Sequence, residues 1–348
     1  MRSSRYGWIG LLVLLGVLVA GTAQAAKLPL VNGAGATFPY PLYSKWFAEY
    51  AEVDPTVNFN YQSIGSGGGI KQVLAQTVDF GASDGPMTDD QLRQAPKEIL
   101  HLPTTLGGVV ATYNLPGMSA KLNFTRAALA GIFLGRIKTW NDPELTAANP
   151  GVALPSQAII VVHRSDGSGT TYIWTDFLSK VSPEWAKRVG RGTSVNWPVG
   201  LGGKGNEGVA GLVKQMPFAI GYVELGYALH SRLLYGTVEN SAGKFVDCTL
   251  ETVTRAAAGA AANMPADFRV SITNPPGADV YPIASFTWLL VYRHQDDPSK
   301  GEALVKFLKW MLEDGQQFAG PLGYAPLPPE VIKLEEAAIA TITIAQSQ

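Results

Sequence analysis

Cysteine is almost absent from this sequence of 348 residues, because Cys248 is the single thiol. One thiol cannot form a disulfide within the chain, so a disulfide-stabilised scaffold is excluded. Charged residues are also few, at 16%, with 27 Lys and Arg against 28 Asp and Glu. That balance lacks the basic excess of nucleic-acid-binding proteins, and we expect no nucleic-acid partner. The fold must therefore rest on a hydrophobic core, and the chain is long enough for two domains.

Long apolar runs are absent except near the start of the chain, where residues 8–20 are almost wholly apolar. Two arginines precede this run, and Ala23-Gln24-Ala25 follows it. A basic start, an apolar middle and a small-residue end are typical of a secretory signal peptide. The run is shorter than the roughly 20 residues of a membrane span, which disfavours the alternative of an uncleaved anchor. We predict a signal peptide over 1–25, cleaved after Ala25, and a mature protein in the periplasm.

A strand, a small-residue turn and a helix are predicted in succession over residues 158–180. The apolar run 158–162 leads into HRSDGSGTT at 163–171, and apolar residues at helical spacing follow. This order puts Ser168, Gly169 and Thr170 at a helix N-terminus, where free backbone N–H groups and the helix dipole favour an anion.

Arg164 and Asp166 lie in the same stretch. Arg164 adds a permanent positive charge and a planar fork of donors, and Asp166 is close enough in sequence to pair with that fork. The alternative reading is a capped helix with an ordinary Arg–Asp pair at the surface. Taken alone, the stretch leaves both interpretations open.

Two more segments combine glycine with a predicted helix start. GAGATFP at 33–39 precedes Leu42, Trp46 and Tyr50, whose spacing of four residues indicates one helix face. It places Thr37 and Phe38 at the entrance of that helix. IGSGGG at 64–69 precedes a short helix pattern at Ile70, Val73 and Leu74. Its glycines let backbone amides approach a ligand closely, and Ser66 can cap the helix or donate its hydroxyl group. A flexible turn is the alternative. The segment lacks the Gly-Lys-Ser/Thr ending of a nucleotide-binding loop.

An acidic side chain follows the strand pattern at 78–83. Asp84 falls just past the end of that strand, in VDFGASDGP, which is where open α/β sheets bind ligands. A turn-forming role for Asp84 is the alternative. Strands alternate with helices along the chain, so we expect parallel sheets of α/β class.

Three local features are predicted nearer the C-terminus. Residues 200–208 form a second glycine-rich loop, in which Lys204 is expected to be solvated rather than to bind an anion. Helix 209–216 follows this loop. Ser299 is expected to cap a long helix whose apolar face includes Leu304 and Phe307.

Four segments, GAGATFP, IGSGGG, VDFGASDGP and RSDGSGT, together resemble the periplasmic phosphate-binding proteins of ABC-type phosphate-specific transport. The resemblance covers roughly 31–328 and includes GRIKTWNDP and NWPVGLGGKGNEGV. It implies a two-lobed, hinged α/β periplasmic binding protein fold with the ligand in a cleft between the lobes. Lobe I would comprise 26–107 plus 284–348, and lobe II 108–283.

The resemblance also implies a binding role for particular residues. Phosphate would be bound by Thr37, Phe38, Ser66, Asp84, Arg164, Ser168, Gly169 and Thr170. Phe38 would contribute its backbone amide, Asp84 would accept a hydrogen bond from a protonated phosphate oxygen, and Asp166 would orient Arg164. Gly67 stands where some members carry a second serine.

The implied function is binding of inorganic phosphate and its delivery to an inner-membrane ABC permease with its ATPase, by a monomer that needs no cofactor or metal. A binder of arsenate, which is protonated as phosphate is, remains an alternative. An exported phosphate-ester hydrolase is a weaker one. Neither Ser66 nor Ser168 lies in Gly-x-Ser-x-Gly, and the four histidines are scattered, with His163 expected to point away from Arg164. We therefore predict that the protein is not an enzyme.

Overall fold

The computed structural model describes residues 28–261 and 263–346, so the predicted signal peptide lies outside the described residues. Within that part of the chain, nine strands form one sheet, in the order β2-β1-β3-β12-β4-β8-β6-β7 with β9 beside β4. These strands are β1 (Leu30–Gly35), β2 (Asn58–Ser63), β3 (Phe80–Ser83), β4 (Ile99–Tyr113), β6 (Ile160–Arg164), β7 (Leu201–Gly203), β8 (Ala219–Glu224), β9 (Leu234–Tyr235) and β12 (Ala284–Tyr292).

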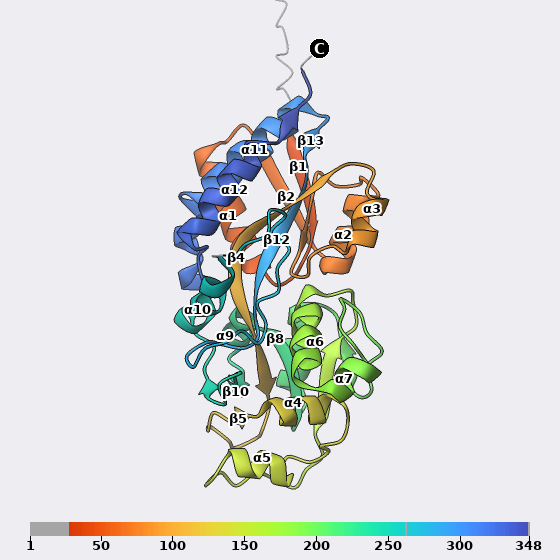
Figure 1. Ribbon diagram of the computed structural model, residues 1–348, viewed down its shortest axis with the longest axis vertical. Coiled ribbons are helices and arrows are strands. Elements are labelled where there is room, and N and C mark those ends of the chain that lie inside the picture. The colour runs from red at the N-terminus through yellow and green to blue at the C-terminus, as the bar shows by residue number, and fades with distance from the viewer. Residues whose placement is uncertain (1–27, 262, 347–348) are drawn as a thin grey trace, which may run out of the picture.

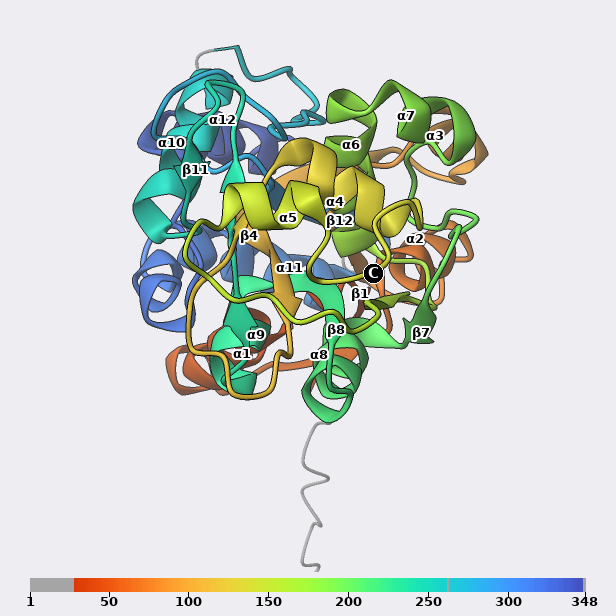
Figure 2. The same cartoon turned by 90° about the horizontal axis from the view of Figure 1, so that it is seen from below.

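Helices cover both faces of this sheet, and Figure 2 shows α6 and α8 on opposite sides of β8. The helices are α1 (Tyr40–Val53), α2 (Ser66–Leu74), α3 (Asp89–Gln94), α4 (Arg126–Phe133), α5 (Pro143–Ala148), α6 (Gly169–Val181), α7 (Pro183–Arg188), α8 (Gly205–Gln215), α9 (Leu225–Ser231), α10 (Leu250–Ala261), α11 (Pro298–Leu312) and α12 (Pro329–Ile339). Two short 3₁₀ helices, η1 (Gly315–Phe318) and η2 (Gly320–Leu322), follow α11. Among the described residues, no helix is both long and apolar enough to cross a bilayer.

Small sheets complete the fold. One joins β5 (Asn123–Phe124), β10 (Thr237–Glu239) and β11 (Phe245–Val246), and another pairs β13 (His294–Gln295) with β14 (Thr343–Ile344). Figure 1 shows an elongated molecule in which β1, β2 and β12 occupy one half, α4 to α7 occupy the other, and β4 extends from one to the other.

The main sheet is mixed, so the expectation of parallel sheets is wrong at its centre. Parallel pairs join β1 to β2 and β3, and β6 to β7 and β8. In contrast, β12 runs antiparallel to β3 and β4, and β4 runs antiparallel to β8. Alternating strand and helix patterns give the order of elements but not the direction in which a late strand returns. Here the chain leaves the first half along β4, and after the second half it re-enters the first half along β12.

The long strand β4 changes partner near its middle. Its residues from Ile99 to Gly108 pair with β12, and those from Val109 to Tyr113 pair with β8. Its side chains are buried almost throughout, because helices cover both faces of the sheet. β4 is thus one continuous element shared by both halves of the molecule.

Three helix starts differ from the sequence-based predictions. Helix α2 begins at Ser66, earlier than the helix pattern that starts at Ile70, because its glycines permit close packing. A Cβ on Gly69 would lie 2.6 Å from the carbonyl oxygen of Ala34 in β1. Helix α8 begins at Gly205, and strand β7 occupies part of the predicted glycine loop. Asp297 rather than Ser299 caps α11, since Pro298 takes the first helical position.

Five junctions that follow parallel strands meet at the middle of the molecule. They are β1–α1, β2–α2 and the end of β3 from one half, and β6–α6 and β7–α8 from the other. The two groups touch, because the backbone N–H of Gly67 donates to the carbonyl oxygen of Gly167 over 2.8 Å. The carboxyl ends of the strands in both halves therefore enclose one region.

Candidate functional site

The β1–α1 junction presents Thr37 and Phe38, both buried. The carbonyl oxygen of Thr37 accepts from the Tyr227 hydroxyl at 2.6 Å, and that of Phe38 accepts from the Tyr324 hydroxyl at 2.7 Å. These bonds hold the backbone just before α1, where N–H groups of the first helical turn have no partner inside the helix. The predicted position of Thr37 and Phe38 at a helix entrance is confirmed.

The β2–α2 junction places Ser66 at the first position of its helix. Gly65 precedes it with φ of 87°, a conformation that glycine adopts at little cost. The Ser66 hydroxyl accepts from the backbone N–H of Asp84 at 3.2 Å and lies 3.5 Å from Asp84 Oδ2. Ser66 and Asp84, which are 18 positions apart, thus form one local group.

Asp84 lies at the end of β3 and is only 1% exposed. The Thr287 hydroxyl donates to its Oδ1 at 2.8 Å. Burial raises the pKa of Asp84 to about 7, although the Thr287 bond and the charge of Arg164 oppose this shift. Asp84 can therefore hold or release a proton near neutral pH.

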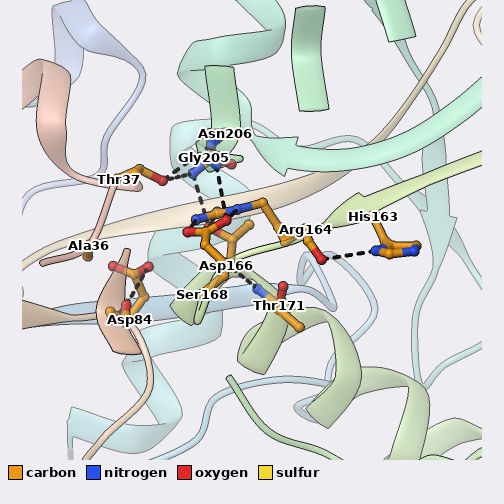
Figure 3. Close-up of polar contacts among 12 residues, drawn as sticks. Ala36, Thr37, Asp84, His163, Arg164, Asp166, Ser168, Thr171, Gly205 and Asn206 are labelled. Atoms are coloured by element: carbon orange, nitrogen blue, oxygen red, sulfur yellow. Dashed lines mark hydrogen bonds and ion pairs between the residues drawn. The ribbon is translucent and has the colours of Figure 1, made fainter. Parts of the chain in front are cut away.

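The β6–α6 junction contains the ion pair that the sequence predicted. Arg164 donates from Nε to Asp166 Oδ1 at 2.8 Å and from Nη2 to Oδ2 at 2.5 Å, as Figure 3 shows. Burial alone would raise the pKa of Asp166, but the bonds from Arg164 and Gly205 hold it below its usual value. Because Arg164 is buried, the alternative of a surface pair is wrong.

Helix α6 starts as predicted, with Ser168 as its N-cap. The Ser168 hydroxyl accepts from the backbone N–H of Thr171 at 3.0 Å. Gly169 follows and faces the opposite half of the molecule, because a Cβ there would lie 2.4 Å from Asp84 Oδ2 and 2.5 Å from Ser66 Oγ. The start of α6 and the end of β3 are therefore in direct contact.

Sequence reasoning missed Asn206, which is fully buried in the first turn of α8. Its Nδ2 donates to Thr37 Oγ1 at 2.8 Å and to Thr170 Oγ1 at 3.1 Å. It follows Lys204, which is exposed as predicted. Because α8 begins earlier than predicted, Asn206 was read as part of a loop. The sequence offered only the resemblance of its segment, GGKGNEGV, to the family.

Thr287 and Glu224 are two further residues that the sequence did not indicate. Thr287 contacts Asp84, as described above. Burial raises the pKa of Glu224 to about 8, and this carboxyl group receives a bond from Tyr324 at 3.1 Å. Both residues lie in strands whose apolar patterns predict only core positions.

His163 points away from Arg164, as predicted from strand alternation. Its ring stacks on Trp197 at 4.8 Å between centroids, and its Nδ1 pairs with the carbonyl oxygen of Arg164. Among the described residues, no group of three His, Cys, Asp or Glu side chains is arranged to hold a metal ion.

The arrangement combines many hydrogen-bond donors, one guanidinium and two carboxyl groups, of which Asp166 is paired with Arg164 and Asp84 is not. Hydroxyl groups come from Thr37, Ser66, Ser168 and Thr170, and three helix N-termini supply backbone N–H groups. Such a set suits a small anion whose charge is met by helix N-termini and one arginine. All nine residues predicted for the site lie in these converging junctions.

Comparisons with known proteins agree with this geometry. Residues 20–314 match the model of the PBP superfamily domain. The chain is 45% identical to the phosphate-binding protein PstS of Pasteurella multocida, over 93% of this chain and 94% of that protein. It is 46% identical to PstS of Xylella fastidiosa, over 91% of this chain and 86% of that protein.

A solved structure, the phosphate-binding protein from Stenotrophomonas maltophilia, has the same fold. It superposes with a TM-score of 0.69 at 20% identity, covering 88% of this chain and 93% of that one. The predicted two-lobed fold is thereby confirmed. The relatives named here are binding proteins rather than enzymes, in agreement with our prediction. From these matches and from the ordered motifs that it carries, the chain belongs to the PBP superfamily and, within it, to the PstS family.

Proposed function

We propose that this protein binds inorganic phosphate and delivers it to an ABC importer. One observation carries the proposal: Asp84, with a pKa near neutrality, faces the N-terminus of α6 and shares its buried region with Arg164. A carboxyl group among donors suits a ligand that has both negative charge and a proton. The names of the PstS relatives support the same ligand.

The donors suffice for a useful affinity. Each hydrogen bond to a charged group contributes ~1.5–3 kcal/mol net. Micromolar binding needs ~8 kcal/mol, and association itself carries a cost. The summed free energy of about ten such bonds therefore exceeds what micromolar binding and the cost of association together require. The residues that we propose to contact phosphate are Thr37, Phe38, Ser66, Asp84, Arg164, Ser168, Gly169 and Thr170, with Asp166 orienting Arg164.

Asp84 gives the site its selectivity in this proposal. Phosphate near neutral pH retains at least one O–H group, which can donate to the Asp84 carboxylate. Sulfate has no proton, so its oxygen would face the ionised carboxylate, the form that prevails above a pH of about 7, without a hydrogen between them. Repulsion of this kind excludes the wrong anion. Arsenate carries a proton as phosphate does, and the site does not distinguish the two by this means.

Two lobes are proposed, with lobe I from 26–107 plus 284–348 and lobe II from 108–283. The partner change of β4 between Gly108 and Val109 supports the first boundary, and the start of β12 at Ala284 supports the other. The contacts between Thr37 and Asn206, and between Gly67 and Gly167, then join the lobes in a closed form.

We also propose that the protein acts in the periplasm as a monomer, after cleavage following Ala25, and that an inner-membrane permease with its ATPase receives the phosphate. The basic and apolar start of the sequence supports export. Lobe closure offers the transporter a means to distinguish loaded from empty protein.

Calorimetric titration of the purified, ligand-stripped protein tests the proposal. Phosphate is expected to bind with micromolar or tighter affinity, and sulfate at least ~10²-fold more weakly. Arsenate serves as the protonated analogue, and release of phosphate from a phosphate ester serves as the assay for hydrolysis. Absence of phosphate binding, or equal affinity for sulfate, would contradict the proposal.

A further inference from the structure

The side-chain amide of Asn206 is held in one orientation. The backbone N–H of Glu224 donates to Asn206 Oδ1 at 3.0 Å. A backbone N–H can only donate, so the atom that receives it must be the amide oxygen. Asn206 Nδ2 must then face the other way, toward the hydroxyl groups of Thr37 and Thr170.

Both of these hydroxyl oxygens accept two N–H donors. Thr37 Oγ1 receives Asn206 Nδ2 at 2.8 Å and the backbone N–H of Asn206 at 3.3 Å. Thr170 Oγ1 receives Asn206 Nδ2 at 3.1 Å and Arg164 Nη1 at 3.4 Å. A hydroxyl group has one donor hydrogen and two acceptor lone pairs. With both lone pairs occupied, each threonine can use its hydroxyl group toward a ligand only as a donor.

The serines of the site are less constrained. Ser66 Oγ accepts one backbone N–H, from Asp84, and Ser168 Oγ accepts one, from Thr171. Within the described part of the chain, one lone pair on each serine therefore has no N–H partner. The two threonines differ from them through Asn206, which contacts a hydroxyl group from each of the proposed lobes.

We propose that Asn206 is a positioning residue that makes Thr37 and Thr170 obligatory donors to the bound anion. This inference rests on the proposed function and deepens it. Because neither threonine can accept the ligand's proton, its acceptors are limited to Asp84 and the two serine hydroxyl groups, and of these the Asp84 carboxylate is the strongest. Asn206 thereby contributes both to affinity and to the choice of protonation state, although it need not touch the ligand.

A mutant cycle tests this role by calorimetric titration with inorganic phosphate. Asn206→Ala is expected to weaken binding by ~10–100-fold, because two hydroxyl groups lose their fixed direction. The pair Thr37→Val and Thr170→Val removes those hydroxyl groups at nearly constant shape. In that background Asn206→Ala should weaken phosphate binding by less than ~2-fold further, because Asn206 no longer has a hydroxyl group to orient. Full additivity would show that Asn206 acts through the fold, and would overturn the inference.

The pH dependence of affinity provides a second readout. Without Asn206 the threonine oxygens can accept a hydrogen bond, which favours the more protonated form of phosphate. The loss of affinity in Asn206→Ala should therefore be smaller at about pH 6 than at about pH 8.5. An equal loss at both pH values contradicts the inference.

Two further variants serve as controls, one for a change at a neighbouring exposed position and one for loss of folding. Lys204→Ala changes an exposed side chain two positions away and should leave affinity unchanged. If Asn206→Ala does not fold, Asn206→Asp keeps the shape but replaces the donor with an acceptor, and it should bind phosphate more weakly than the wild type. A wild type that does not bind phosphate contradicts the proposed function, whereas a binding wild type with unaffected Asn206 variants contradicts this inference alone.

Discussion

The carboxyl group of Asp84 and the Cα of Gly169 approach so closely that a side chain on Gly169 has no room. A Cβ there would lie 2.4 Å from Asp84 Oδ2. The two residues come from the ends of β3 and the start of α6, in the two halves of the molecule. This contact brings a donor-rich helix terminus against Asp84, the carboxyl group that we propose accepts the proton of the ligand.

Replacement of Gly169 should prevent the two halves from closing around the ligand. In Gly169→Ala the added methyl group overlaps Asp84 and Ser66, so we expect phosphate affinity to fall by at least ~10²-fold. The midpoint of thermal unfolding should change little, because an open form of the protein avoids the overlap. Calorimetry and thermal unfolding measure the two quantities. Gly211→Ala is the matched control, because a Cβ on Gly211 meets no atom of the described part of the chain within 4 Å. Undiminished affinity in Gly169→Ala would contradict the closed geometry.

Replacement of Asp84 should relax selectivity more than it weakens phosphate binding. Asp84→Asn preserves the size of the side chain and offers an N–H group to an unprotonated oxygen. The ratio of phosphate to sulfate affinity should fall by ~10²-fold or more, as expected when a repulsive carboxylate is removed. A competition titration with both anions measures the ratio. An unchanged ratio would show that Asp84 is not the discriminating group.

The stability of the ligand-free protein should decrease as the pH rises, in part through Glu224. Burial raises the pKa of Glu224 from 4.5 to about 8. Between those values the folded protein holds a proton that the unfolded chain has released, so stability falls across this range. Glu224→Gln cannot titrate, and its amide oxygen can still accept from the Gly226 N–H that Glu224 caps.

We expect Glu224→Gln to resist urea better than the wild type at about pH 8.5, by on the order of 1 kcal/mol, and to match it at about pH 5. Glu302→Gln, at an exposed position of α11, should show no such pH-dependent gain. Parallel pH profiles for Glu224→Gln and the wild type would argue against a buried, protonated Glu224.

Replacement of Glu335 should stabilise the protein. Glu335 is 0% exposed, and neither carboxyl oxygen has a hydrogen-bond partner among the residues that the structure describes. It shares the buried face of α12 with Val331 and Ile339. Glu335→Leu removes an unsatisfied polar group, so the free energy of unfolding should rise by ~1–3 kcal/mol.

The gain from Glu335→Leu should grow with pH, because burial raises the pKa of Glu335 well above its usual value and ionisation becomes increasingly costly in the folded state. Glu336→Leu, at the exposed neighbouring position, is the control. Urea unfolding at about pH 5 and about pH 8 measures both variants. A loss of stability in Glu335→Leu would contradict the prediction, because it would mean that the Glu335 carboxyl group is stabilised by a polar partner in the folded protein.

The junctions that form the site were largely predictable from short sequence segments. Ser168 capping α6, and Thr37 and Phe38 ahead of α1, follow from local preferences of caps, glycine and helical spacing. The resemblance to the family then assigned these residues to one site. Neither source indicated Asn206, because an asparagine in a glycine-rich segment is typical of an ordinary turn.

Taken by itself, the sequence determined the order of strands and helices, the helix caps near the site and the family to which the chain belongs, because these depend on neighbouring residues and on ordered motifs. Only the tertiary structure decided that β4 pairs antiparallel with β12 in one half and with β8 in the other, that Asn206 reaches Thr37 across 169 positions, and that the Asp84 pKa lies near neutrality. These properties arise from burial and from contacts between distant segments, and no local pattern encodes the distance between two parts of a folded chain.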